Sequence, residues 1–226
     1  MLIAGHDRPP LPADPRIEFV AVDWPVEPPG PHNDDSGRKK HLLSERVLAR
    51  GGGLFMVVDA DDWVDRATVA TARRLLAGEA AIGGVITRGE VVDLASLRAA
   101  ALPDPRIFGE FHRVCGSSTI ARLRPEAAEP LRRDPFSVLR SHHAWLERSA
   151  EAGVELVRLP VSAGYLIGTS INHSDVHGPH ADWRRGFRRA VNAHGAPLGA
   201  DLAARFGLEL DEVRAVSARI AAVEGR

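Results

Sequence analysis

The most constraining feature of the sequence is an apolar run that ends abruptly in carboxylates. Leu54 to Val58 follows three glycines, Gly51 to Gly53, and is followed at once by Asp59, Asp61 and Asp62. A short apolar run with β-branched residues between breakers is typical of a buried strand. The acids are therefore expected at the carboxyl end of a strand, which in open α/β sheets is the edge where ligands bind.

The acidic turn, Asp59 to Asp62, has two interpretations. Asp59 and Asp61 are two positions apart and carry the hard oxygen ligands that Mg²⁺ or Mn²⁺ prefers. With Asp62 they predict a metal site that holds the phosphates of a nucleotide. The structural alternative is a loop in which Asp61 or Asp62 caps a helix expected from Val64 to Ala77.

Composition limits the class of protein. A chain of 226 residues with 44% hydrophobic residues is long enough for one α/β domain with its own core. The formal net charge of −1 gives no overall field to hold nucleic acid or an anionic membrane. The single cysteine, Cys115, and the lack of an apolar stretch of about 20 residues predict a soluble cytoplasmic protein without a disulfide or transmembrane segment.

The periodicity of the chain predicts an α/β order of elements. Apolar runs predict strands at Met1 to Ala4, Arg16 to Asp23 and Val154 to Val161, and helical spacing predicts a helix from about Pro135 to Gly153. Residues 1–180 are expected to form an open, mixed but mostly parallel sheet with helices on both faces.

The remaining residues, 181–226, are expected to form an entirely helical C-terminal extension. Its basic surface contains Arg184, Arg185, Arg188 and Arg189. Two short amphipathic helices after Gly199 predict docking on the domain or on a partner, for example in a homodimer.

A cationic run opens the helix that precedes the acidic strand. Arg38, Lys39 and Lys40 follow the N-cap candidates Asp34 to Ser36. A solvated helix face usually explains such a run. Because this helix feeds directly into the strand, the run also predicts a contact with a diphosphate held at the same crevice.

Histidines gather at two places. His173, His177 and His180 lie in a loop after an apolar stretch, and neutral imidazole is a competent metal ligand, so His173 and His177 are candidates to complete the metal site. His142 and His143 lie on the helix expected after Pro135.

These segments resemble a known family. Gly37 to Lys40, a helix, the strand Leu54 to Val58 and the motif Asp59-Ala60-Asp61-Asp62-Trp63-Val64 are similar to the central part of glycosyltransferases with the A-type nucleotide-binding fold. The likeness is to the family-two-like group, and Phe111 to Ile120 and Asn172-His173-Ser174 resemble later parts of its bacterial members. It covers residues 1–180 and implies a fold like that of nucleotide-diphospho-sugar transferases.

The resemblance implies a metal-dependent glycosyltransferase that moves a sugar from a nucleotide-diphosphate donor to a hydroxyl of a saccharide, lipid or protein acceptor. Asp59 to Asp62 would bind Mn²⁺ or Mg²⁺ and the donor diphosphate, with Asp61 the favoured ligand. Lys39 or its neighbours would contact the donor's base or phosphates, and His173 or His177 would close the metal site. The ion would offset charge on the leaving diphosphate.

Two features depart from the family pattern. By this resemblance the strand at Met1 to Ala4 would correspond to the family's second strand, so the likeness does not extend to the usual first βα unit, whose loop wraps the nucleoside. Ser141-His142-His143 stands where the family has a Glu-Asp pair that supplies the inverting base. His142 or His143 is therefore the expected proton acceptor.

Other functions fit parts of the pattern. A haloacid-dehalogenase-like phosphatase also places Asp-x-Asp after an apolar strand, but Trp63 stands where Thr or Val is expected and no lysine follows Lys40. A non-catalytic nucleotide-sugar-binding or interaction protein would explain the absent Glu-Asp pair. Hydrolysis of the donor without transfer is a further alternative.

Overall fold

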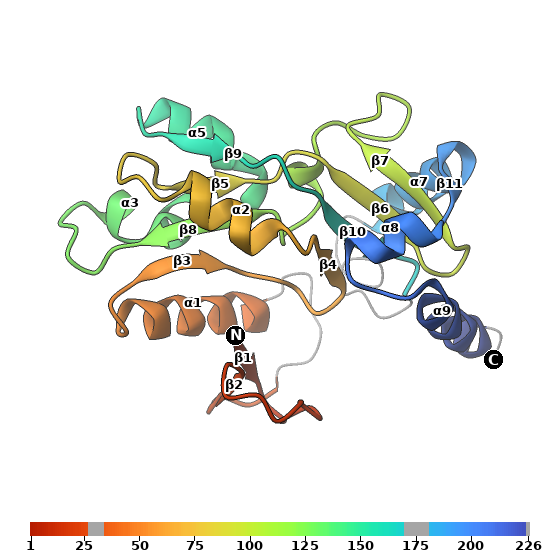
Figure 1. Ribbon diagram of the computed structural model, residues 1–226, viewed down its shortest axis with the longest axis horizontal. Helices are drawn as coiled ribbons and strands as arrows, with labels where there is room; N and C mark the ends of the chain where they lie inside the picture. The colour runs from red at the N-terminus through yellow and green to blue at the C-terminus, as the bar shows by residue number, and fades with distance from the viewer. Residues whose placement is uncertain (27–33, 170–180, 225–226) are drawn as a thin grey trace.

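The computed structural model describes residues 1–26, 34–169 and 181–224, and Figure 1 shows their arrangement. Strands and helices alternate along much of the chain, as in an α/β protein. The strands are β1 (Leu2–Gly5), β2 (Glu18–Ala21), β3 (Gly53–Met56), β4 (Asp62–Val64), β5 (Gly83–Val85), β6 (Gly89–Asp93), β7 (Arg98–Leu102), β8 (Thr119–Leu123), β9 (Leu156–Arg158), β10 (Ala163–Ile167) and β11 (Ala196–Pro197). The helices are α1 (Asp34–Leu48), α2 (Thr68–Leu75), α3 (Pro130–Arg133), α4 (Pro135–Leu139), α5 (Trp145–Glu151), α7 (Ala181–His194), α8 (Ala200–Arg205) and α9 (Leu210–Glu224), with 3-10 helices η1 (Phe111–Arg113) and η2 (His142–Ala144).

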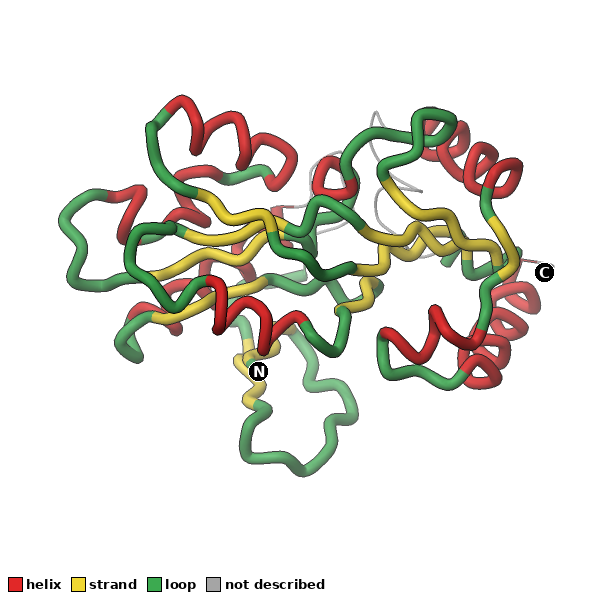
Figure 2. Tube along the Cα trace, turned by 45° about the horizontal axis from the view of Figure 1, so that its top comes forward, coloured by secondary structure: helices red, strands yellow, loops and turns green. Residues whose placement is uncertain are grey.

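The strands form two sheets and a separate pair. The first sheet has the order β3-β8-β5-β9, the second has the order β11-β7-β6-β10-β4, and β1 pairs with β2 alone. The chain passes from the first sheet to the second three times, from β3 to β4, from β5 to β6 and from β9 to β10, and Figure 2 shows the two sheets side by side. The expectation of one open sheet is therefore wrong.

The pairing is mixed, as expected, but it is not mostly parallel. The pairs β1–β2, β5–β9 and β6–β10 are parallel, whereas the other five pairs are antiparallel. β8 runs antiparallel to both of its neighbours, and β6 and β7 are consecutive strands joined by a short connection. Antiparallel strands need only such a connection, whereas a parallel pair needs a crossover.

Helices cover both faces of the first sheet, as the sequence predicts. Alternate residues of β3 and the residues just after it point to opposite faces, as a strand requires. Leu54 and Met56 pack with α2, and Phe55 and Val57 pack in the cluster that contains core residues of α1, α4 and α5. The acidic strand is therefore held between two apolar layers.

The expected C-terminal extension is partly built into the second sheet. Asp93, at the end of β6, is fully buried and accepts hydrogen bonds from Arg188 Nε at 2.9 Å and Asn192 Nδ2 at 2.6 Å, both on α7. A buried carboxylate needs such partners. β11 adds Ala196 and Pro197 to the edge of the sheet beside β7, so the expectation of an entirely helical tail is wrong.

The helix expected from Pro135 to Gly153 is also interrupted. α4 ends at Leu139, and Arg140 has a φ of 58°, which a continuing α-helix does not allow. The chain then passes through η2 before α5 begins at Trp145. This break places the two adjacent histidines in the short 3-10 helix η2 instead of on the face of a long α-helix.

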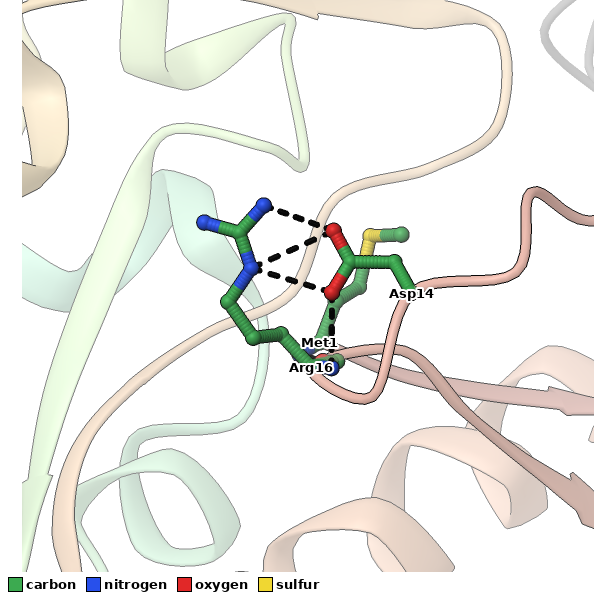
Figure 3. Close-up of polar contacts among 3 residues, drawn as sticks. All are labelled: Met1, Asp14 and Arg16. Carbon is green, nitrogen blue, oxygen red and sulfur yellow. Dashed lines mark hydrogen bonds and ion pairs between the residues drawn. The ribbon is translucent and has the colours of Figure 1, made fainter.

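The β1–β2 pair is held by contacts within the loop that connects its strands and by contacts with α1. Figure 3 shows Asp14 bonded to the backbone N–H and the guanidinium of Arg16, while the amino group of Met1 donates to the Arg16 carbonyl. On α1, Asp35 lies 3.0 Å from His6 Nε2 and accepts from Trp24 Nε1 at 2.9 Å. These contacts tie the loops after β1 and β2 to the start of α1.

Substitution of Gly83 tests the tight packing of β5 on β8. A Cβ at Gly83 would lie 2.2 Å from the carbonyl oxygen of Ile120, whereas a Cβ at Gly37 in α1 would meet no atom within 4 Å. We expect Gly83→Ala to lower the free energy of unfolding by about 1–3 kcal/mol through overpacking. The control Gly37→Ala should raise it by up to about 1 kcal/mol, because alanine favours a helix. Urea unfolding followed by circular dichroism measures both, and a Gly83→Ala variant as stable as the wild type would contradict this packing.

Candidate functional site

The acidic turn lies just beyond β3 and is fixed by the loop Cys115–Ser118. This loop leads into β8, the antiparallel neighbour of β3, so the two segments meet at the same edge of the sheet. The backbone N–H of Asp59 donates to Ser117 Oγ at 2.8 Å, and the Cys115 thiol donates to Asp62 Oδ2 at 3.3 Å. The turn itself is closed by the Asp62 N–H, which donates to the Asp59 carbonyl at 3.0 Å.

The loop also needs a glycine to approach the turn so closely. A Cβ at Gly116 would lie 2.9 Å from Asp59 Oδ2 and 3.8 Å from Nδ1 of His142. The Asp59 carboxylate, Gly116 and the His142 imidazole therefore converge at one place, which brings together a strand end, a loop and η2.

The helix-capping interpretation of the acids is wrong. Asp62 begins β4, which pairs with β10, and α2 begins only at Thr68. The N-cap residue of α2 is Ala67, which makes no side-chain cap. Asp61 and Asp62 thus lie before a strand or within it, and they are free of any capping role.

Asp62 is the most deeply embedded of the three acids. The pKa of its carboxyl is raised to about 7. Burial is the largest cause of this rise, a hydrogen bond from Ser117 opposes it, and the nearby charges of Asp61 and Asp59 add to it. Its Oδ1 atom is buried and has no hydrogen-bond partner among the described residues. Since its other oxygen already accepts from Cys115, Asp62 is less suited to hold a cation than its two neighbours.

Asp59 and Asp61 form a pair of mutually repelling acids flanked by cations. Asp59 Oδ1 lies 3.0 Å from Lys40 Nζ. Burial raises the pKa of Asp61, the charge of Asp59 raises it further, and the positive charges of Arg184 and Lys40 oppose the rise. A pair of carboxylates in this setting gains from a further positive charge between them.

Arg184, on α7, brings an uncompensated guanidinium to the turn. Its carbon Cζ lies 5.0 Å from the centre of the Tyr165 ring and 5.3 Å from that of Trp183. Burial lowers its pKa, while the charges of Asp62 and Asp61 oppose that shift. The atoms Nε and Nη1 are buried and have no hydrogen-bond partner in the described part of the chain. Buried guanidinium nitrogens without hydrogen bonds are costly, so these two atoms favour an anionic ligand.

The cationic run of α1 divides among different places. Lys40 reaches Asp59, as described above, whereas Lys39 Nζ binds Asp35 Oδ2 at 2.5 Å on its own helix. Arg38 is exposed. Burial alone would raise the pKa of Asp35, but hydrogen bonds from Lys39, Trp24 and His6 lower it to about 2. Of the three predicted cations, Lys40 is thus the one for which the structure gives a contact with the acidic turn.

The two histidines predicted as proton acceptors differ in their surroundings. Burial, the neighbouring His143 and Lys40 lower the pKa of His142 to about 4, so its imidazole is neutral at pH 7. His143 is exposed, and its Nδ1 lies 2.8 Å from Ser141 Oγ. Of these two histidines, only His142 faces the place where Asp59 and Gly116 converge.

A third histidine, His112 of η1, was not predicted as part of the site. It is fully buried, and neither ring nitrogen has a hydrogen-bond partner among the described residues. Burial lowers its pKa, and Glu110 Oε2 lies 3.9 Å from Nδ1. Its positive form would also disfavour protonation of His142.

The metal site predicted from the sequence is only partly tested. His173 and His177 lie outside the described residues. Within residues 1–26, 34–169 and 181–224, no three His, Cys, Asp or Glu side chains come together as metal ligands. Asp59 and Asp61 nevertheless fit a Mg²⁺ or Mn²⁺ ion, because such ions are commonly held by one or two carboxylates together with phosphate oxygens and water.

No family model, no curated protein and no solved structure matches this chain. None of the described helices is both long and apolar enough to cross a bilayer.

The buried Asp62 predicts a specific dependence of stability on pH. In the unfolded chain its pKa is near 3.8 and in the folded protein it is about 7, so between these values only the folded state holds the proton. The stability of the wild type relative to Asp62→Asn should therefore fall as the pH rises through this window, by about 2 kcal/mol between pH 5.5 and 7. Urea unfolding at several pH values measures this difference.

The control is Asp23→Asn, which removes a carboxyl that is exposed instead of buried. A constant difference between the wild type and Asp62→Asn from pH 5 to 8 would show that Asp62 is ionised in the folded protein.

Proposed function

We propose that this protein binds a nucleotide-diphosphate sugar at the acidic turn and transfers the sugar to an acceptor hydroxyl. The observation that carries the proposal is the acid pair Asp59 and Asp61, with Lys40 at 3.0 Å from Asp59 and with the positive charge of Arg184, two of whose buried nitrogens lack a hydrogen bond among the described residues, lowering the pKa of Asp61. A binding site for a diphosphate needs acids that hold a metal ion and cations that neutralise the phosphate oxygens. A fold like that of nucleotide-diphospho-sugar transferases is part of the same proposal.

In this proposal the diphosphate is held from two sides. The planar guanidinium of Arg184 binds two phosphate oxygens in a bidentate manner, which a lysine does not do. Asp59 and Asp61 supply carboxylate oxygens to Mg²⁺ or Mn²⁺, and Lys40 fixes the orientation of Asp59. When bound, the ion offsets the charge that develops on the leaving diphosphate.

The reaction needs one bond to break and another to form. The bond between the anomeric carbon and the diphosphate oxygen breaks, its electron pair leaves with the nucleoside diphosphate, and the acceptor oxygen attacks the same carbon. The acceptor proton must go to a base. His142 is the proposed base because it lies beside Asp59 and is neutral at pH 7. The acceptor is a saccharide, a lipid or a protein in this proposal.

The surroundings of His142 also favour a second candidate function. A base with a pKa of about 4 is a weak proton acceptor at neutral pH, since an efficient general base has a pKa near the working pH. A nucleotide-sugar-binding protein without turnover would retain the diphosphate contacts and would not need this base. The two candidates share the donor site and differ in product formation. Phosphatase activity and hydrolysis of the donor without transfer stay alternatives that product analysis separates.

Arg184 provides the sharpest test of the donor site. We expect Arg184→Gln to weaken binding of the preferred nucleoside diphosphate at least about tenfold, because a charge-assisted bidentate contact is lost. Asp61→Asn should remove the gain in affinity that Mn²⁺ gives the wild type. Isothermal titration with uridine, guanosine, thymidine, cytidine and adenosine diphosphates, with and without Mn²⁺, measures both effects.

The matched control is Arg189→Gln, which removes an exposed arginine from the same helix and should leave the affinity unchanged. Equal affinity in Arg184→Gln and the wild type would remove Arg184 from the donor site. If the diphosphate binds as proposed, incubation with the corresponding nucleotide sugars and analysis of products then separates transfer from binding alone.

A further inference from the structure

A cavity lies at the junction of the two sheets, away from the acidic turn. Its volume is about 800 Å³, within the range of about 300–1,000 Å³ for small-molecule sites. Its lining comes from the connections β5–β6 and β9–β10, from the end of β7 and from single residues near β4 and α8. None of the residues that surround the acidic turn lines it, including Lys40, His142 and Arg184.

Three arginines from different segments line this cavity. Arg88 comes from the connection between β5 and β6, Arg158 from the end of β9, and Arg205 from the end of α8. Arg88 is exposed, and within the described residues its guanidinium has no hydrogen bond or ion pair. Arg158 pairs with Glu110 and Arg205 pairs with Glu90, so Arg88 is the arginine of the three without an ion pair among the described residues.

Two acids, Asp65 and Glu90, also line the cavity, so they cancel part of this charge and leave three arginines against two carboxyl groups in the lining. Asp65 Oδ1 already accepts the backbone N–H of Ala67 at 2.7 Å. Glu90 lies 3.3 Å from Arg205, and burial raises the pKa of its carboxyl while the charge of Arg205 opposes the rise. Glu110 is not part of the lining, but it forms an ion pair with Arg158 at 2.5 Å and offsets the charge of that guanidinium from outside the cavity.

The cavity also has a rigid apolar side. Leu102 and Leu159 line it and are almost fully buried, with 2% and 4% of their surface exposed. Gly89 lines it as well, and a Cβ there would lie 2.4 Å from the ring of Phe111, so the backbone at this point is closely packed. Apolar surface beside a cluster of arginines suits a ligand with a charged end and a less polar body.

We propose that this cavity is a second binding site, specific for a phosphorylated small molecule about the size of a hexose phosphate. A phosphate group has three terminal oxygens and carries up to two negative charges. It therefore suits a site with three guanidiniums better than a carboxylate group of a ligand would. The body of the ligand lies against Leu102 and Leu159, and its hydroxyls meet the Glu90 carboxyl. The site is separate from the proposed donor site and does not depend on it.

Glucose 6-phosphate, inorganic phosphate and glucose are the probes for this site, each titrated into the full chain by calorimetry. We expect glucose 6-phosphate to bind, inorganic phosphate to bind more weakly, and glucose not to bind. Arg88→Gln should weaken the binding of glucose 6-phosphate at least about tenfold. The exposed Arg46→Gln on α1 is the matched control and should bind as the wild type does. Because Arg88 is exposed, its substitution does not disturb the core.

Lys40→Gln separates this proposal from the proposed function. Glucose 6-phosphate binding that is retained in Lys40→Gln and lost in Arg88→Gln supports the second site, even if no nucleoside diphosphate binds. Binding lost in Lys40→Gln and retained in Arg88→Gln would place the phosphate at the acidic turn and overturn the proposal. Absence of binding to the wild type, or equal affinity for inorganic phosphate and glucose 6-phosphate, would overturn it as well.

Discussion

The hydrogen bonds between the acidic turn and the loop Cys115–Ser118 fix the part of the molecule on which the site depends. Ser117 accepts the backbone N–H of Asp59, and the Cys115 thiol donates to Asp62. Both segments are positioned because β3 and β8 are antiparallel neighbours within a sheet covered on both faces. Three carboxylates are thereby held close together, and their repulsion has to be balanced by positive charge.

The balancing charges come from distant parts of the chain. Lys40 reaches Asp59 from α1, and Arg184 reaches the other acids from α7, which is itself anchored through Arg188 to the buried Asp93. The helix α7 therefore belongs to the site as well as to the second sheet. The buried guanidinium nitrogens without partners among the described residues are the main reason to expect an anionic ligand here.

Local pattern in the sequence predicts the strand before the acidic turn, the helix that begins at Asp34 and the helices on both faces of the first sheet. It does not predict the division into two sheets, because strand pairing depends on contacts distant in sequence. The break at Arg140 also escapes prediction, since a positive φ there has no sequence signal such as glycine. Arg184 was predicted only as part of a basic surface, since its burial against Tyr165 depends on how α7 packs.

The most direct test of the donor site is an amide NMR spectrum of the full chain with the tightest-binding nucleoside diphosphate and a trace of Mn²⁺. The paramagnetic ion broadens the signals of nearby amides. If the acidic turn holds the ion and the diphosphate, broadening should centre on Asp59–Asp62 and Cys115–Ser118, extend to Arg184, and require the nucleotide. Broadening centred elsewhere, or none at a saturating nucleotide concentration, would contradict the assignment of this turn as the donor site.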